Sequence, residues 1–134
     1  MARSKKTKEP EYTLNIFRAQ DPKTLHEGWV FLVRTVKEFV SFNYEILLSS
    51  TLGKNAITLK ITGIHAPLLV MPGIGPAKGS VFLRGLVGPY ALTVKKLNKE
   101  VNDFKIVLRS QSAEVRSAPD HPFITIRTDA LPLD

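Results

Sequence analysis

Apolar and polar residues alternate through most of this 134-residue chain, and this period of two restricts its fold more than any other feature. Tyr12, Leu14 and Ile16 alternate with polar residues near the start. The same alternation recurs in NYEILLSS (43–50), AITLKITGI (56–64), PYALTVKKL (89–97) and DFKIVLRS (103–110). Because successive side chains of a strand point to opposite faces, each segment predicts a half-buried β-strand.

The short connections between these segments predict hairpins. The stretch TLGKN separates the first pair, where Gly53 permits a left-handed turn, and residues 98–102 separate the second pair. Further strands are expected at 67–71, 80–86 and 122–128, and a loop at 112–121. Many short strands punctuated by glycine and proline are typical of a mainly β protein, so we expect an antiparallel β-sandwich or barrel.

Residues 24–41 fit two interpretations. As a helix, they would carry one apolar stripe, formed by Trp29, Leu32, Val33, Val36, Phe39 and Val40. As a strand, the segment WVFLV is favoured by its β-branched residues and by Gly28. The dipeptide Asp21-Pro22 is a helix start signal, and the second half is amphipathic. We therefore expect one helix near residues 24–41, which makes an α+β fold the alternative to an all-β one.

A single domain behind a short basic arm accounts for the length and charge of the chain. The net charge is +7, from 19 Lys and Arg against 12 Asp and Glu. Residues 1–10 form the expected flexible arm, with Arg3, Lys5, Lys6 and Lys8, and residues 11–134 form one β-rich domain. The basic N-terminus is not followed by the apolar region that a signal sequence requires, no apolar run is long enough for a membrane span, and there is no cysteine. We expect a soluble, cytoplasmic protein without membrane insertion.

The stretch VMPGIGPAKGS (70–80) is the one segment that looks like a functional motif. A nucleotide-binding P-loop needs its lysine after the last glycine, but here the order is Lys78-Gly79-Ser80. A dinucleotide fingerprint needs a helix after its glycines, whereas SVFLRGLVGP has two glycines, a proline and β-branched residues there. Both phosphate-binding motifs therefore fail on spacing or context.

The core MPGIGPAKG resembles the hairpin of the helix-hairpin-helix family over about nine residues. The resemblance implies that backbone N–H groups around Gly73, Ile74 and Gly75 donate to a DNA phosphate, with Lys78 nearby. Gly79 stands where the family usually has alanine, and Pro67 interrupts the first helix. The competing interpretation, which we favour, is a loop at 72–79 that turns the chain between two strands.

Basic residues on the predicted strands form a second candidate site. Lys60, Lys95, Lys105 and Arg109 alternate onto the polar side, and Arg84 lies within the expected strand at 80–86. Such a face can track a phosphate backbone, but it is also what a solvated sheet presents. The aromatic residues Tyr90 and Phe104 fall on the opposite, apolar side, where they cannot stack on bases.

No pattern in the chain points to catalysis. Three single histidines (His26, His65 and His121) have no metal-ligand spacing, and no nucleophile motif is present, so we expect no enzyme, no metal and no cofactor. We expect a non-enzymatic interaction module that binds a protein partner or assembles as a homo-oligomer. The alternative is a nucleic-acid-binding domain that uses the basic arm, the Gly/Pro loop and the Lys/Arg sheet face.

Overall fold

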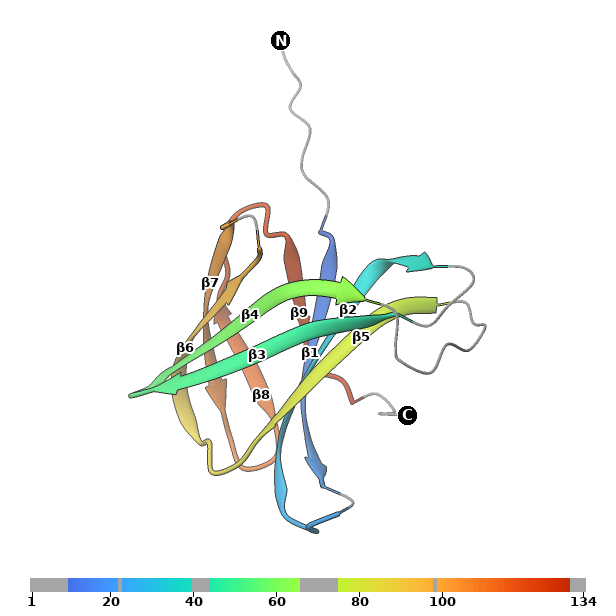
Figure 1. Ribbon diagram of the computed structural model, residues 1–134. Helices are drawn as coiled ribbons and strands as arrows, with labels where there is room; N and C mark the ends of the chain where they lie inside the picture. Colours follow the sequence, from blue (N-terminus) through green and yellow to red (C-terminus); the bar gives the residue numbers. More distant parts are fainter. Residues whose placement is uncertain (1–9, 22, 40–43, 66–74, 98, 131–134) are drawn as a thin grey trace.

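The computed structural model describes residues 10–21, 23–39, 44–65, 75–97 and 99–130. These residues form nine strands: β1 (Tyr12–Gln20), β2 (Glu27–Phe39), β3 (Glu45–Gly53), β4 (Ala56–His65), β5 (Gly75–Leu83), β6 (Gly88–Lys95), β7 (Val101–Leu108), β8 (Ala113–Ser117) and β9 (Ile124–Arg127). All belong to one sheet in the order β8-β7-β6-β4-β3-β5-β2-β1-β9, which curls into a nearly closed barrel (Figure 1). The mainly β fold predicted from the alternation is confirmed.

The sheet is mixed rather than purely antiparallel. Hairpin neighbours pair antiparallel, as in β1–β2, β3–β4 and β6–β7. By contrast, β1–β9, β3–β5 and β4–β6 pair in parallel. The parallel pairs join strands that are not consecutive in the chain, so no local turn signal announces them.

The helix expected near residues 24–41 is wrong, because β2 occupies most of that segment and no helix forms in the part of the chain that the structure describes. β2 is buried on both faces. Trp29, Phe31 and Val33 point into the main core, while Val30 and Leu32 join a smaller cluster on the other side. When both faces of a strand are apolar, the sequence loses its period of two and imitates a helical stripe.

Both predicted hairpins form. In β3–β4, Gly53 pairs with Ala56 around two turn residues, and Asn55 rather than Gly53 takes the left-handed conformation, with φ of 54°. Asparagine tolerates this region because its short side chain is compatible with it. In β6–β7, the register pairs Leu92 with Phe104, and both side chains are buried in the core as expected.

Two strand boundaries differ from the sequence prediction. Residues 112–121, expected as a loop, contain β8, which pairs antiparallel with β7. The segment 122–128, expected as the last strand, contains β9. The run 67–71, expected as a buried strand, lies outside the described residues.

The main core fills the inside of the barrel. Every described strand except β8 contributes buried side chains to it, and β8 contributes partly buried ones. Trp29 is fully buried, and its indole Nε1 donates a hydrogen bond of 3.1 Å to the carbonyl oxygen of Leu86. A buried indole N–H needs such a partner, so this bond fixes the segment after β5 against β2. None of the described residues belongs to a helix long and apolar enough to cross a membrane.

Candidate functional site

The glycine-rich stretch does not have the structure of a helix-hairpin-helix motif in its described part. Gly73 and Ile74 lie outside the described residues. From Gly75 onward the chain is strand β5, where the resemblance implies a helix, and Lys78 pairs with Arg34 of β2 and Glu45 of β3. The expected loop at 72–79 is therefore wrong from residue 75 on, since these residues are inside a sheet ladder.

Gly79 has a packing role that its place in the motif did not indicate. A Cβ atom at this position would lie 2.4 Å from the carbonyl oxygen of Ile46. Real Cβ atoms do not approach an oxygen so closely, so β3 and β5 can be neighbours only with glycine here. Gly79 thus serves the close approach of two backbones.

The predicted basic residues do not form one surface. Lys60 and Lys95 are directly opposite each other in the β4–β6 ladder, and both are exposed. Lys105 is exposed opposite Ala91, four residues along β6 from Lys95. Elsewhere, Arg84 contacts His26, and Arg109 forms an ion pair of 2.7 Å with Glu114. The arm residues Arg3, Lys5, Lys6 and Lys8 lie outside the described residues.

The barrel does not close between its two edge strands, β8 and β9 (Figure 1). Residues of both strands line a groove there. We call it the seam groove; it has a volume of about 660 Å³ and is lined by Ala113, Glu114, Val115, Ile126, Arg127, Thr128 and Asp129. Its apolar floor consists of Ala113, Val115 and Ile126, which are partly buried against the main core. Among the described strands, β8 pairs with β7 alone and β9 with β1 alone, so the other side of each is a strand edge facing the groove.

Charged residues form the rims of the seam groove. Glu114 on β8 forms ion pairs with Arg109 at 2.7 Å and Arg116 at 3.0 Å, and Asp129 pairs with Arg127 at 3.1 Å. Hydrogen bonding from Arg109 lowers the pKa of Glu114, and hydrogen bonding from Arg127 lowers the pKa of Asp129. Both carboxylates are exposed, so these pairs keep the rims charged and hydrated more than they stabilise the fold.

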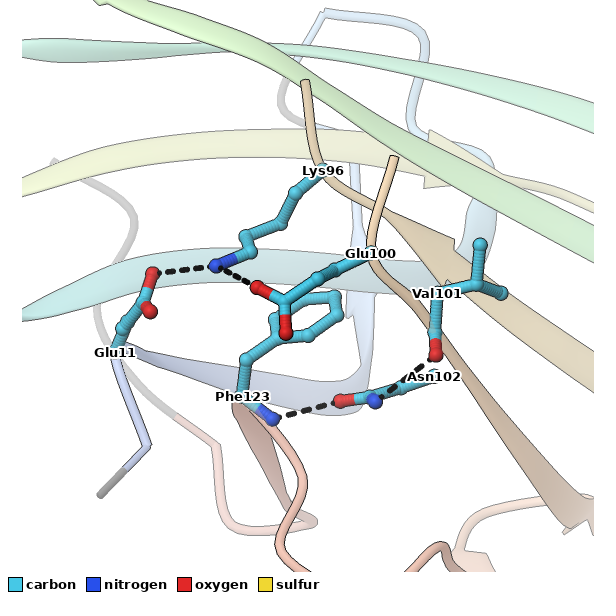
Figure 2. Close-up of polar contacts among 6 residues, drawn as sticks. All are labelled: Glu11, Lys96, Glu100, Val101, Asn102 and Phe123. Carbon is cyan, nitrogen blue, oxygen red and sulfur yellow. Dashed lines mark hydrogen bonds and ion pairs between the residues drawn. The ribbon is translucent and has the colours of Figure 1, made fainter. Parts of the chain in front are cut away.

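The other end of the seam is closed by a set of polar contacts that we call the latch (Figure 2). The ammonium of Lys96 lies 2.8 Å from carboxylate oxygens of both Glu11 and Glu100, and 4.8 Å from the centre of the Phe123 ring. The side-chain oxygen of Asn102 accepts a hydrogen bond of 2.8 Å from the backbone N–H of Phe123. These contacts tie the residue before β9 to the start of β7, so the seam is closed there and open beside β8.

Glu11 and Glu100 stabilise the charged form of Lys96. Burial by itself lowers the pKa of this lysine, but hydrogen bonds to Glu100 and Glu11 and the charges of both acids raise it above the ordinary value. Burial and the charge of Glu11 also raise the pKa of Tyr12, which packs edge-on against Phe123. Lys96 is therefore a charged lysine whose side chain is nine-tenths buried.

The sequence contained weak signals for strand β8 and for the latch, neither of which was predicted. Ala113 and Val115 alternate with Glu114 and Arg116, which is a short period of two within the expected loop. The latch contains an i,i+4 pair, Lys96 and Glu100, but its partners at positions 11 and 123 are far away in the chain. Among the described residues, no group of three or more His, Cys, Asp or Glu side chains could hold a metal ion.

Comparison of the chain with protein-family models, with curated proteins and with solved structures finds no match. The candidate sites therefore rest on the geometry of the seam groove and of the basic residues alone.

Proposed function

We propose that this protein is a non-enzymatic interaction module that binds an extended segment of a protein partner, or of a second copy, in the seam groove. The observation that carries the proposal is the pair of strand edges with an apolar floor between them. An extended peptide can add to such an edge through main-chain hydrogen bonds, while its alternate side chains enter the pockets below.

The directions of β8 and β9 determine how an added strand would pair with them. Following the pairing sense around the sheet, β8 and β9 run antiparallel to each other. A strand entering the groove would be antiparallel to one edge and parallel to the other. It would complete the barrel and remove both exposed edges at once, which is the strongest reason for a strand to bind there.

The lengths of the two edge strands limit how many residues of a bound segment can pair with them. β8 has five residues and β9 has four, so the paired part of a ligand would be four or five residues long. Since alternate side chains share a face, two or three of them would meet Ala113, Val115 and Ile126. Aliphatic residues at alternate positions suit this floor, and polar residues between them suit the charged rims.

The nucleic-acid alternative has less support. Its predicted residues are dispersed over β4, β5, β6, β7 and the segments that follow them, and Arg109 is already neutralised by Glu114. A phosphate backbone is followed by a continuous row of free cations, which these residues do not provide.

Sedimentation velocity over a wide range of protein concentrations tests self-association, and fluorescence anisotropy with labelled peptides of alternating valine and threonine tests capture of a partner segment. We expect binding in at least one of the two assays. Val115→Lys should abolish it, because a lysine on the floor of the groove opposes strand addition. Thr125→Lys, on the outward face of β9, is the matched control and should leave binding unchanged.

Thermal melts of both variants establish that they fold. A protein that stays monomeric at all concentrations and binds no peptide would contradict the proposal. So would equal loss of binding in the two variants, because the effect would then come from added charge and not from the groove.

A further inference from the structure

A second groove lies where the outer face of β4 and β6 meets the connection between β6 and β7. We call it the lysine groove; its volume is about 340 Å³ and it is lined by Lys60, Ile61, Thr62, Lys95, Lys96, Leu97, Lys99 and Val101. It is separate from the seam groove, with which it shares no lining residue. The volume is at the lower end of those that hold small organic ligands.

Three lysines give this groove its charge. Lys60 and Lys95 are directly opposite each other in the β4–β6 ladder, and like charges at such positions repel. Neither they nor Lys99 have an ion-pair partner among the residues that the structure describes. The fourth lysine, Lys96, is paired with the carboxylates of both Glu11 and Glu100 in the latch. Lys60, Lys95 and Lys99 thus bring three positive charges to the groove, and none of the three forms an ion pair with another described residue.

Lys99 has an unusual backbone conformation beside this groove. Lys99 has a φ of 73°, in the left-handed region that lysine rarely adopts, and its N–H donates to the carbonyl oxygen of Lys96 at 3.0 Å. A non-glycine residue in this region costs free energy and is commoner at binding sites than elsewhere. Here the conformation belongs to the turn that brings Lys99 to the groove.

The remaining lining is aliphatic. Leu97 is 72% exposed and Val101 is 45% exposed, and both border the same groove as the lysines. None of the described residues that line it is aromatic. The site thus pairs ammonium groups with aliphatic surface, and it has no platform on which a nucleobase could stack.

We propose that the lysine groove binds a phosphate group carried by an aliphatic compound, with the phosphate among Lys60, Lys95 and Lys99 and the aliphatic part against Leu97 and Val101. Lysine suits a phosphate because its ammonium acts as a compact point charge. The basic residues among its described lining are all lysines, without the planar guanidinium donors that recognise a carboxylate in a bidentate manner. The compound could be a free alkyl phosphate or the headgroup of a lipid, since both present the same chemistry.

Isothermal titration of the full chain with inorganic phosphate and with hexyl phosphate tests the site, and flotation with phosphatidylcholine vesicles containing phosphatidic acid tests the lipid source. We expect hexyl phosphate to bind about tenfold more tightly than inorganic phosphate, which corresponds to burial of between one and two methylene groups at about fourfold each. Affinity for either compound should fall as salt is added. Binding to the vesicles but not to hexyl phosphate would support the site and assign it to a lipid.

The variants separate this groove from the other basic residues. The double variant Lys60→Gln/Lys95→Gln should lose at least tenfold in affinity, whereas Lys105→Gln, exposed on β7 outside the groove, should bind as the unmodified protein does. Leu97→Asn should remove the advantage of hexyl phosphate and leave phosphate binding intact. All four positions are solvent-exposed, and thermal melts verify that the variants fold.

Three results would overturn the proposal. The first is no binding of any phosphate compound, and the second is equal affinity in the double variant and in Lys105→Gln. The third is tighter binding of a single-stranded oligonucleotide than of hexyl phosphate, which would assign the groove to a phosphodiester backbone. None of these results bears on the proposal for the seam groove. That proposal is tested separately by Val115→Lys, which changes no residue of the lysine groove.

Discussion

Gly79 shows how one residue allows two strands to meet. Its missing side chain leaves room for the backbone of β3 beside β5, where a Cβ atom would also lie 3.0 Å from the Cβ atom of Ile46. Rigid backbone cannot move aside as a flexible side chain can, so the contact tolerates no larger residue without displacement of a strand.

Gly79→Ala should lower the free energy of unfolding by about 3 kcal/mol, the upper end of the cost of overpacking, because the clash is with backbone. Gly53→Ala is the matched control, since a Cβ atom there meets only Ala56, at an ordinary 3.7 Å. Urea unfolding followed by the fluorescence of Trp29 measures both. Equal effects of the two substitutions would show that β3 and β5 do not approach as closely as described.

The sequence identified the glycine stretch as unusual but did not explain it. Spacing alone cannot distinguish a glycine that binds phosphate from one that admits a neighbouring strand, because both need an absent side chain. The neighbour of Gly79 is Ile46, which is more than thirty positions away in the chain.

Among the strand pairs, β4–β6 has one face that is buried in the core and another on which two lysines repel each other. Leu59 and Val94 are directly opposite each other and fully buried, while Lys60 and Lys95 meet on the outer face of the same pair. The apolar contacts hold the strands together against the repulsion of the two lysines.

Lys60→Thr should therefore raise the free energy of unfolding by about 0.5 kcal/mol, the size of a cross-strand pair effect. The gain should shrink in high salt, because exposed charges are screened. Lys105→Thr controls for the higher strand propensity of threonine, since Lys105 lies opposite Ala91 and not another lysine. Chemical denaturation at low and high salt measures both variants, and an equal, salt-independent gain would rule out repulsion as the cause.

Predictions at the element scale succeeded where one face of a strand is exposed. The hairpins β3–β4 and β6–β7 follow directly from their alternation and their turns. β2 was taken for a helix because both of its faces are buried, and β8 was taken for a loop because it is short and carries charges on its outer side. In both cases the pattern of burial comes from neighbours that the segment itself does not reveal.

For the whole molecule, the latch determines where the barrel closes. Lys96 joins Glu11, just before β1, to the β6–β7 connection, and it covers Phe123, just before β9. Residues from the beginning and from the last third of the chain thus share one ammonium group (Figure 2). Loss of its charge should loosen the closed end of the seam.

The free energy of unfolding should decrease as the pH rises above about 10. The pKa of Tyr12 is raised from 10.0 and that of Lys96 from 10.5, so the folded protein holds both protons more tightly than the unfolded chain. Their contribution is complete below these values and is lost as the pH passes the folded pKa values. Urea unfolding at a series of pH values from neutral to alkaline measures this slope.

Lys96→Met tests the assignment to the latch. We expect a loss of about 2 kcal/mol at neutral pH, since Glu11 and Glu100 lose their shared partner but remain accessible to water. The slope above pH 10 should become shallower than in the unmodified protein. Lys95→Met, at the adjacent exposed position, should keep the original slope; a parallel change in both variants would mean that the latch does not hold the charge of Lys96.

The β class, the two long hairpins and the side of each hairpin that enters the core all follow from patterns in the amino-acid sequence. These properties are local, because an exposed face imposes the period of two and a turn needs only its own residues. The order of the strands, the open seam between β8 and β9, and the contacts of Lys60 with Lys95 and of Lys96 with Glu11 are visible only in the folded molecule. Each of these brings together segments far apart in the chain, and which segments meet depends on how the entire sheet closes around one core.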